Sequence, residues 1–165
     1  MRRTVFAVSL VLVAAFAVSL TMVYGADMFA GTWKANIAKS KYIPGPAPKS
    51  NTQKIESVDN GFKLVADGVN DQGQKAHNEY TVKFDGKDYP EKPMLDGKPN
   101  PNGADAISIK KIDDSTYEAT TKQKGKILTV TKNVVSKDGK TRISTTTGKN
   151  VQGQSVSNVV VWEKQ

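Results

Sequence analysis

The chain has 165 residues and a formal net charge of +8 at pH 7, and it contains no cysteine and one histidine. This composition excludes a disulfide-stabilised scaffold, a zinc site built from Cys and His, and a cysteine nucleophile. The lysines are scattered, and Arg142 is the only arginine after residue 3, whereas nucleic-acid binders cluster arginine with aromatic residues. We therefore expect no nucleic-acid partner and interpret the charge as a contribution to solubility.

Residues 1–25 have the features of a secretory signal peptide. Arg2 and Arg3 precede an almost wholly apolar run over residues 5–23, and a small-residue site ends at Gly25. Cleavage after Gly25, or alternatively after Ala26, leaves residues 26–165 as a single domain. The alternative is an uncleaved anchor, because an apolar run of this length could just span a bilayer. We expect a secreted or periplasmic protein that meets a membrane only through this segment before cleavage.

The first element expected after this segment is a strand over residues 31–36, and a proline-rich stretch follows it. Residues 43–50 contain Pro44, Pro46 and Pro48, which favour an extended crossing and disfavour a paired strand. We expect this stretch to cross an open end of the fold on its way to the second strand.

After residue 50 the chain alternates between short runs of period-two polarity and turn signals. Glycine, asparagine and aspartate mark the turns, as in Asp59-Asn60-Gly61 and Lys137-Asp138-Gly139. This rhythm predicts an all-β, up-and-down antiparallel sheet of about eight to ten strands. We expect the sheet to close into a barrel, because closure removes the unpaired edge strands of a long sheet. The runs expected to be strands are 62–66, 80–84, 107–109, 117–120, 127–135, 141–147 and 156–162.

Residues 89–103 interrupt this rhythm with four prolines and two glycines. Such a composition predicts a long irregular loop, either a mobile surface loop or a segment that covers a binding site. Because it cannot pair as a central strand, we expect it to lie at an end or a flank of the barrel.

Two motifs carry a resemblance to a known group of proteins. Gly31-Thr32-Trp33 resembles the first-strand signature of lipocalins and fatty-acid-binding proteins, the calycins, and residues 160–164 resemble the last strand of fatty-acid-binding proteins. The whole of residues 28–165 also resembles secreted bacterial proteins described as lipocalin-like. The resemblance implies a calycin-like barrel with Gly31 and Trp33 at one closed end and an arginine packed on Trp33. It also implies a small apolar or amphipathic ligand.

The inward faces of the predicted strands supply the candidate ligand-binding residues. Arg142 has two possible roles, either as the partner of a ligand carboxylate or as a structural cation that packs on Trp33 or Trp162. The residues expected to line the barrel interior are Phe62, Leu64, Tyr80, Val82, Phe84, Ile107, Ile109, Tyr117 and Arg142.

We expect no catalytic residues, no metal and no cofactor. His77 is the only histidine, so a metal site of the usual kinds and a Ser-His hydrolase both lack their parts. We expect His77 to lie at the surface or rim, and a haem ligand is the alternative role.

Three functions remain open after these exclusions. The first is a carrier or sensor of a small ligand, the second a protein-binding module such as an inhibitor, and the third a structural barrel with a filled core. A cavity in the barrel distinguishes the first from the other two.

Overall fold

The computed structural model describes residues 28–165, and the predicted signal peptide of residues 1–25 lies outside this range. Every element of the described chain is a β-strand. Residues 28–165 contain no helix that is long and apolar enough to cross a membrane. The strands are β1 (Gly31–Lys41), β2 (Ser50–Val58), β3 (Gly61–Val69), β4 (Lys75–Lys83), β5 (Tyr89–Pro90), β6 (Met94–Leu95), β7 (Lys98–Pro99), β8 (Ala106–Lys111), β9 (Thr116–Gln123), β10 (Lys126–Val135), β11 (Thr141–Lys149) and β12 (Ser155–Lys164).

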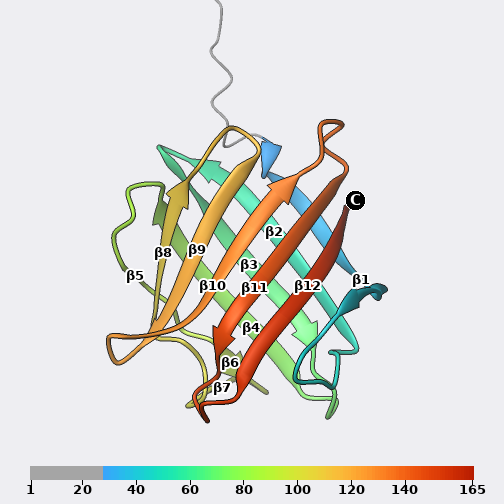
Figure 1. Ribbon diagram of the computed structural model, residues 1–165, viewed down its shortest axis with the longest axis vertical. Helices are drawn as coiled ribbons and strands as arrows, with labels where there is room; N and C mark the ends of the chain where they lie inside the picture. Colours follow the sequence, from blue (N-terminus) through green and yellow to red (C-terminus); the bar gives the residue numbers. More distant parts are fainter. Residues whose placement is uncertain (1–27) are drawn as a thin grey trace, which may run out of the picture.

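All twelve strands belong to one antiparallel sheet with the order β5-β8-β9-β10-β11-β12-β1-β2-β3-β4-β6-β7. The sheet curls so that β1–β4 lie behind β8–β12 in the view of Figure 1. This is the antiparallel up-and-down architecture predicted from the sequence. The strand count exceeds the expected eight to ten because residues 89–103 contribute three strands of two residues each.

The two flanks of the sheet approach each other between β4 and β8, a line that we call the seam. Asp85 and Lys110 form an isolated antiparallel bridge there, and the Gly86 N–H donates to the Ile109 carbonyl at 3.0 Å. Among the described strands, β4 has no ladder with β8 and pairs instead with β6 through Ala76 and His77. Backbone bonds thus join the seam at this end, and the segment after β5 runs beside the rest of it.

One end of the barrel is packed solid. Phe29, Trp33 and Phe62 are fully buried, and the rings of Phe29 and Tyr117 meet edge to face with centroids 4.8 Å apart. The Trp33 indole N–H donates to the Phe29 carbonyl at 2.8 Å, so the chain leading into β1 is tied across this end. Trp33 is thus part of this packed end.

Gly31 supports the same end by letting another chain segment pass close to it. Its φ of +124° suits glycine, and a Cβ there would lie 2.7 Å from Cε of Lys164. The Lys164 side chain crosses over Gly31 and places its ammonium 5.1 Å from the centroid of the Trp33 ring.

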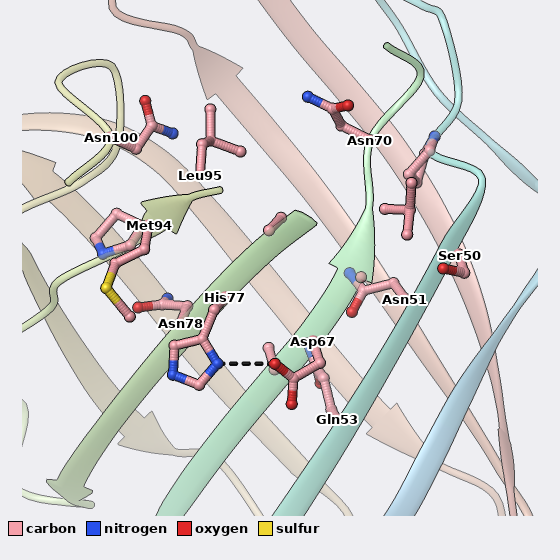
Figure 2. A pocket seen from close by; sticks show the side chains of 16 residues that line it. Ser50, Asn51, Gln53, Asp67, Asn70, His77, Asn78, Met94, Leu95 and Asn100 are labelled. Carbon is pink, nitrogen blue, oxygen red and sulfur yellow. Dashed lines mark hydrogen bonds and ion pairs between the residues drawn. The ribbon is translucent and has the colours of Figure 1, made fainter. Parts of the chain in front are cut away.

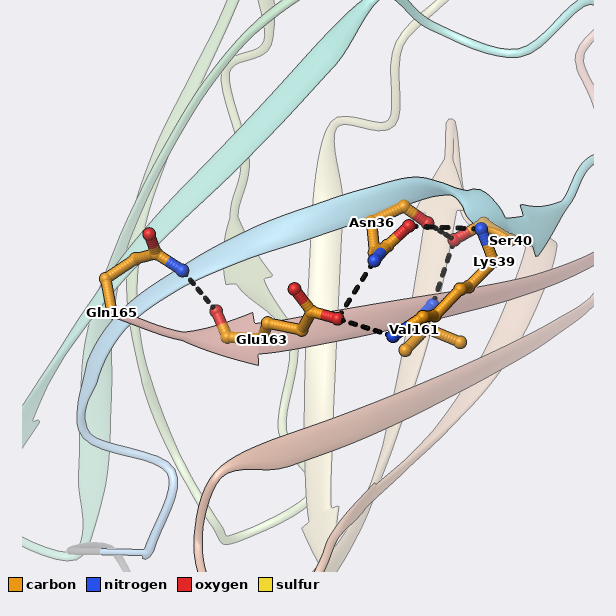
Figure 3. A network of polar contacts seen from close by, with 6 residues as sticks. All are labelled: Asn36, Lys39, Ser40, Val161, Glu163 and Gln165. Carbon is orange, nitrogen blue, oxygen red and sulfur yellow. Dashed lines mark hydrogen bonds and ion pairs between the residues drawn. The ribbon is translucent and has the colours of Figure 1, made fainter.

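The first and last strands are joined by a network of polar contacts around a bulge in β1. The β1–β12 register shifts between Asn36, which pairs with Val161, and Lys41, which pairs with Val159. The Ser40 hydroxyl bridges this interruption, donating to the Asn36 carbonyl at 2.7 Å and accepting from the Val161 N–H at 3.0 Å. Figure 3 shows this bridge beside the Glu163 carboxylate, which accepts from the Asn36 amide and the Lys39 ammonium.

Candidate functional site

The half of the barrel away from the packed end is hollow. A cavity of about 220 Å³ lies inside it, between the walls formed by β2–β4 and β8–β12. We call this space the interior cavity. The residues that line it are Gln53, Leu64, Ala66, Asn78, Tyr80, Glu91, Ile107, Tyr117, Ala119, Thr121, Thr131, Asn133, Ser144, Thr146, Val160 and Trp162.

The interior cavity continues toward a second space of about 300 Å³, which we call the mouth cavity. The two share Gln53, Ala66 and Asn78 as wall residues. Figure 2 shows Met94 and Leu95 of β6 on one side of the mouth cavity and Asn51 on the other. Asn78 therefore lies on the part of the wall that the two cavities share.

The sequence-predicted interior residues divide between the two halves of the barrel. Leu64, Tyr80, Ile107 and Tyr117 line the interior cavity. The remaining candidates do not line it and belong to the buried core or its margin, namely Phe62, Val82, Phe84, Ile109 and Arg142.

Arg142 is buried and packs against two indole rings. Its guanidinium carbon is 5.1 Å from the ring centroid of Trp33 and 4.7 Å from that of Trp162. One terminal nitrogen donates to Gln53 Oε1, while Nε and the other terminal nitrogen are buried without a hydrogen-bond partner among the described residues. Burial lowers the pKa of Arg142, and the nearby Tyr117 phenol opposes this shift. The structure thus contains the structural packing on Trp33 and Trp162 that was one of the two expected roles.

The wall formed by β10, β11 and β12 is polar, and its groups satisfy one another. The Trp162 indole N–H donates to Ser144 Oγ at 2.9 Å, and the Ser144 hydroxyl donates to Asn133 Oδ1 at 2.5 Å. Nearer the mouth, the hydroxyls of Thr131 and Thr146 are 2.9 Å apart. This chain of bonds fixes the side chains of the wall in one arrangement.

The polar groups at the seam are not satisfied in this way. The Asn78 amide donates to Glu91 Oε1 at 2.5 Å, which joins β4 to the segment after β5. Asn78 Oδ1 and Glu91 Oε2 are both buried and have no hydrogen-bond partner among the described residues. Burial raises the pKa of Glu91 to about 7, and the hydrogen bond from Asn78 opposes the shift.

The backbone holds Glu91 in place from the other side of the seam. Its N–H donates to the Asp105 carbonyl at 3.0 Å, next to the pairing of Pro90 with Ala106. Glu91 also lines a cavity of about 420 Å³ formed mainly by residues of the segment 89–103, among them Lys92 and Pro93. It therefore separates the interior cavity from this outer space.

These findings correct the prediction for residues 89–103. The segment is not irregular throughout, since β6 pairs with β4 and with β7, and β5 pairs with β8. It lies at the flanks of the sheet, as predicted, but it also delivers the Glu91 side chain to the interior. A single glutamate among prolines gives no sequence signal for such a position.

His77 is partly exposed and is one of the residues that line the mouth cavity. Its Nδ1 is 2.8 Å from Asp67 Oδ1, and this pair spans neighbouring positions of β4 and β3 (Figure 2). His77 neighbours Ala76 and Asn78, whose side chains alternate to the opposite face of the strand. In the part of the chain that the structure describes, no group of three or more His, Cys, Asp and Glu residues could hold a metal ion.

Comparison with solved structures shows a likeness in fold. No family model matches the sequence, and no curated protein matches it. Among solved structures, the chain is similar to zebrafish ileal bile acid-binding protein complexed with cholic acid, at 15% sequence identity and a TM-score of 0.48. The match covers 84% of this chain and 99% of that one.

Proposed function

We propose that the protein binds a small amphipathic molecule in the interior cavity and that its function is binding, not catalysis. The observation that carries this proposal is an interior cavity of about 220 Å³ whose wall combines apolar side chains with polar ones. Ligand sites in proteins are typically concave and mostly apolar, with a few placed polar groups. Leu64, Ile107 and Val160 offer the apolar contact, and the polar groups lie at the seam and along β10–β11.

The size of the space limits the class of ligand. Drug-sized sites measure roughly 300–1,000 Å³, so the interior cavity accepts only a small molecule or a short chain that extends into the mouth cavity. A secreted or periplasmic location with a lipocalin-like role is part of this proposal, supported by the signal-like residues 1–25.

Native mass spectrometry and a titration test the proposal together. The protein purified from producing cells is examined for a bound small molecule. It is then titrated with octanoate, 1-octanol and octylamine while tryptophan fluorescence is followed, because Trp162 lines the cavity. We expect saturable binding of at least one of these probes.

Cavity-filling variants show where the probe binds. Ala119→Phe and Val160→Phe place a ring in the interior cavity, and two variants are used in case one fails to fold. Thr120→Phe adds the same ring to the opposite face of β9 and serves as the control. Binding lost in the filling variants and kept in the control supports the proposal. No bound molecule and no saturable probe would overturn it in favour of a protein-binding module.

A further inference from the structure

The interior cavity has two hydrogen-bond acceptors that nothing in the described chain satisfies. Asn78 Oδ1 and Glu91 Oε2 are buried, they belong to residues whose side chains already touch, and both residues line the cavity. An unsatisfied buried polar atom costs roughly 1–3 kcal/mol, and native structures contain few of them. Two in one place form a feature that a bound group would complete.

The chemistry of the pair decides what kind of group that is. One N–H of the Asn78 amide donates to Glu91 Oε1, and the two oxygens without a partner are acceptors when Glu91 is ionised. Across the cavity, the Trp162, Ser144 and Asn133 chain is already internally bonded. Among the described residues that line the cavity, the buried side-chain atoms left without a partner are therefore both acceptors, and they lie at the seam.

We propose that Asn78 and Glu91 form a subsite that selects ligands bearing a hydroxyl or amino group at the seam end of the interior cavity. This inference rests on the proposed binding function and specifies the ligand class. A hydroxyl would donate to one of the two free oxygens. An ammonium group would donate to both and would also neutralise the Glu91 carboxylate.

The position of Asn78 and Glu91 suits a ligand that reaches this subsite from the mouth cavity. Asn78 lies where the mouth cavity meets the interior cavity, because its side chain belongs to both walls. A molecule that extends from the mouth cavity into the interior cavity would therefore lie against this residue. The donor group is thus recognised at the inner end of the access path, while the apolar part packs against Leu64 and Val160.

A matched series of probes tests the subsite, with octyl methyl ether as the analogue of 1-octanol that cannot donate. Titrations of the full protein are run at about pH 8, where a carboxyl group with a pKa of about 7 is mostly ionised. We expect octylamine and 1-octanol to bind at least about tenfold more tightly than the ether, the factor that corresponds to one satisfied hydrogen bond.

Two variants and a control test whether Asn78 and Glu91 cause the preference for ligands that donate a hydrogen bond. Glu91→Gln should remove the advantage of octylamine over 1-octanol. The double variant Asn78→Leu/Glu91→Leu replaces both polar partners and should bring the ratio of 1-octanol to ether affinity close to one while leaving the ether bound. Glu79→Gln changes a carboxylate on the outer face of β4 that pairs with Lys63 and should alter neither ratio.

The outcomes separate this inference from the proposed function. Equal binding of 1-octanol and the ether by the wild-type protein would overturn the donor subsite and leave interior binding in place. A preference that survives the double variant would also overturn it. Failure of octylamine, 1-octanol and the ether alike to bind the wild-type protein would overturn both.

Discussion

The guanidinium carbon of Arg142 lies 4.7 Å from the ring centroid of Trp162. The same carbon lies 5.1 Å from the ring centroid of Trp33, so one planar cation contacts two indole rings. No carboxylate among the described residues forms an ion pair with Arg142. The contact with the rings and the bond to Gln53 therefore provide its main compensation for burial.

We predict that the planar shape of the Arg142 side chain contributes more to the stability of the fold than its charge does. Arg142→Lys keeps a buried charge but loses the planar stacking, and Arg142→Ala leaves a void between the rings. Each should lower the free energy of unfolding by roughly 2–4 kcal/mol. Arg142→Met removes the charge and fills most of the volume, so it should remain closer to the wild-type protein. Urea titrations followed by tryptophan fluorescence give this ranking, and a Lys variant as stable as the wild type would contradict it.

Glu91 should make stability depend on pH. The folded pKa of about 7 lies above the ordinary value of 4.5. Between these two values the folded protein keeps a proton that the unfolded chain has released. The free energy of unfolding should therefore fall as pH rises through this window, by an amount on the order of 3 kcal/mol or less.

The Glu91→Gln variant isolates this contribution. Its side chain cannot ionise, so it should be more stable than the wild type at about pH 8 and similar to it near pH 4.5. The other ionisable groups at the cavity stay out of the window, because burial raises the pKa of Tyr80 and Tyr117 and Arg142 remains charged. Stability is measured by thermal unfolding as a function of pH. If the stabilities of the wild type and the variant depend on pH in the same way, the prediction of a raised pKa for Glu91 is contradicted.

Substitution of Trp33 should destabilise the fold strongly. It is fully buried, and its indole N–H is bonded to the Phe29 carbonyl. Trp33→Ala removes this bond and opens a large void, which should cost on the order of 3–5 kcal/mol. Ile127→Ala, at a position with 63% exposure, is the control and should change stability by less than about 0.5 kcal/mol. A small shift of the melting midpoint for Trp33→Ala would contradict the packed end.

The Ser40 hydroxyl should hold the bulge of β1 against β12. Ser40→Ala removes the bonds to the Asn36 carbonyl and from the Val161 N–H, and it leaves both groups to find water. We expect a loss of about 1–2 kcal/mol and faster hydrogen exchange at the Val161 amide. Ser157→Ala, at an exposed position of β12, is the matched control. Unchanged exchange at Val161 in the Ser40 variant would show that the strand pairing alone holds this region.

The sequence predicted the fold well where inward side chains are apolar. In β3, Phe62 and Leu64 are buried on one face, and the period-two pattern identified this strand. In β2 the residues beside the cavity are Asn51 and Gln53, with Ile55 buried deeper. This strand shows no apolar alternation, and the pattern did not mark it.

In β10 and β11, too, some inward-facing side chains are polar and some outward-facing ones are apolar. Asn133 and Ser144 face inward and are buried, whereas Val134 and Ile143 face outward with exposures of 38% and 44%. A strand that lines a polar cavity wall breaks the rule that polar residues face water. The seam could not be predicted either, because the contact between Asn78 and Glu91 depends on a curl of the whole sheet and leaves no local pattern.

The outermost strands of the sheet have a consequence for the behaviour of the protein in concentrated solution. β5 and β7 end the strand order, each has two residues, and each contains a proline, Pro90 or Pro99. Proline has no N–H to offer an incoming chain, so another molecule finds almost no backbone on which to add a strand. The longer unpaired stretch of β4 faces β8 within the same molecule. A barrel without disulfides is thereby protected from intermolecular β-pairing, the first step toward fibrils and other aggregates.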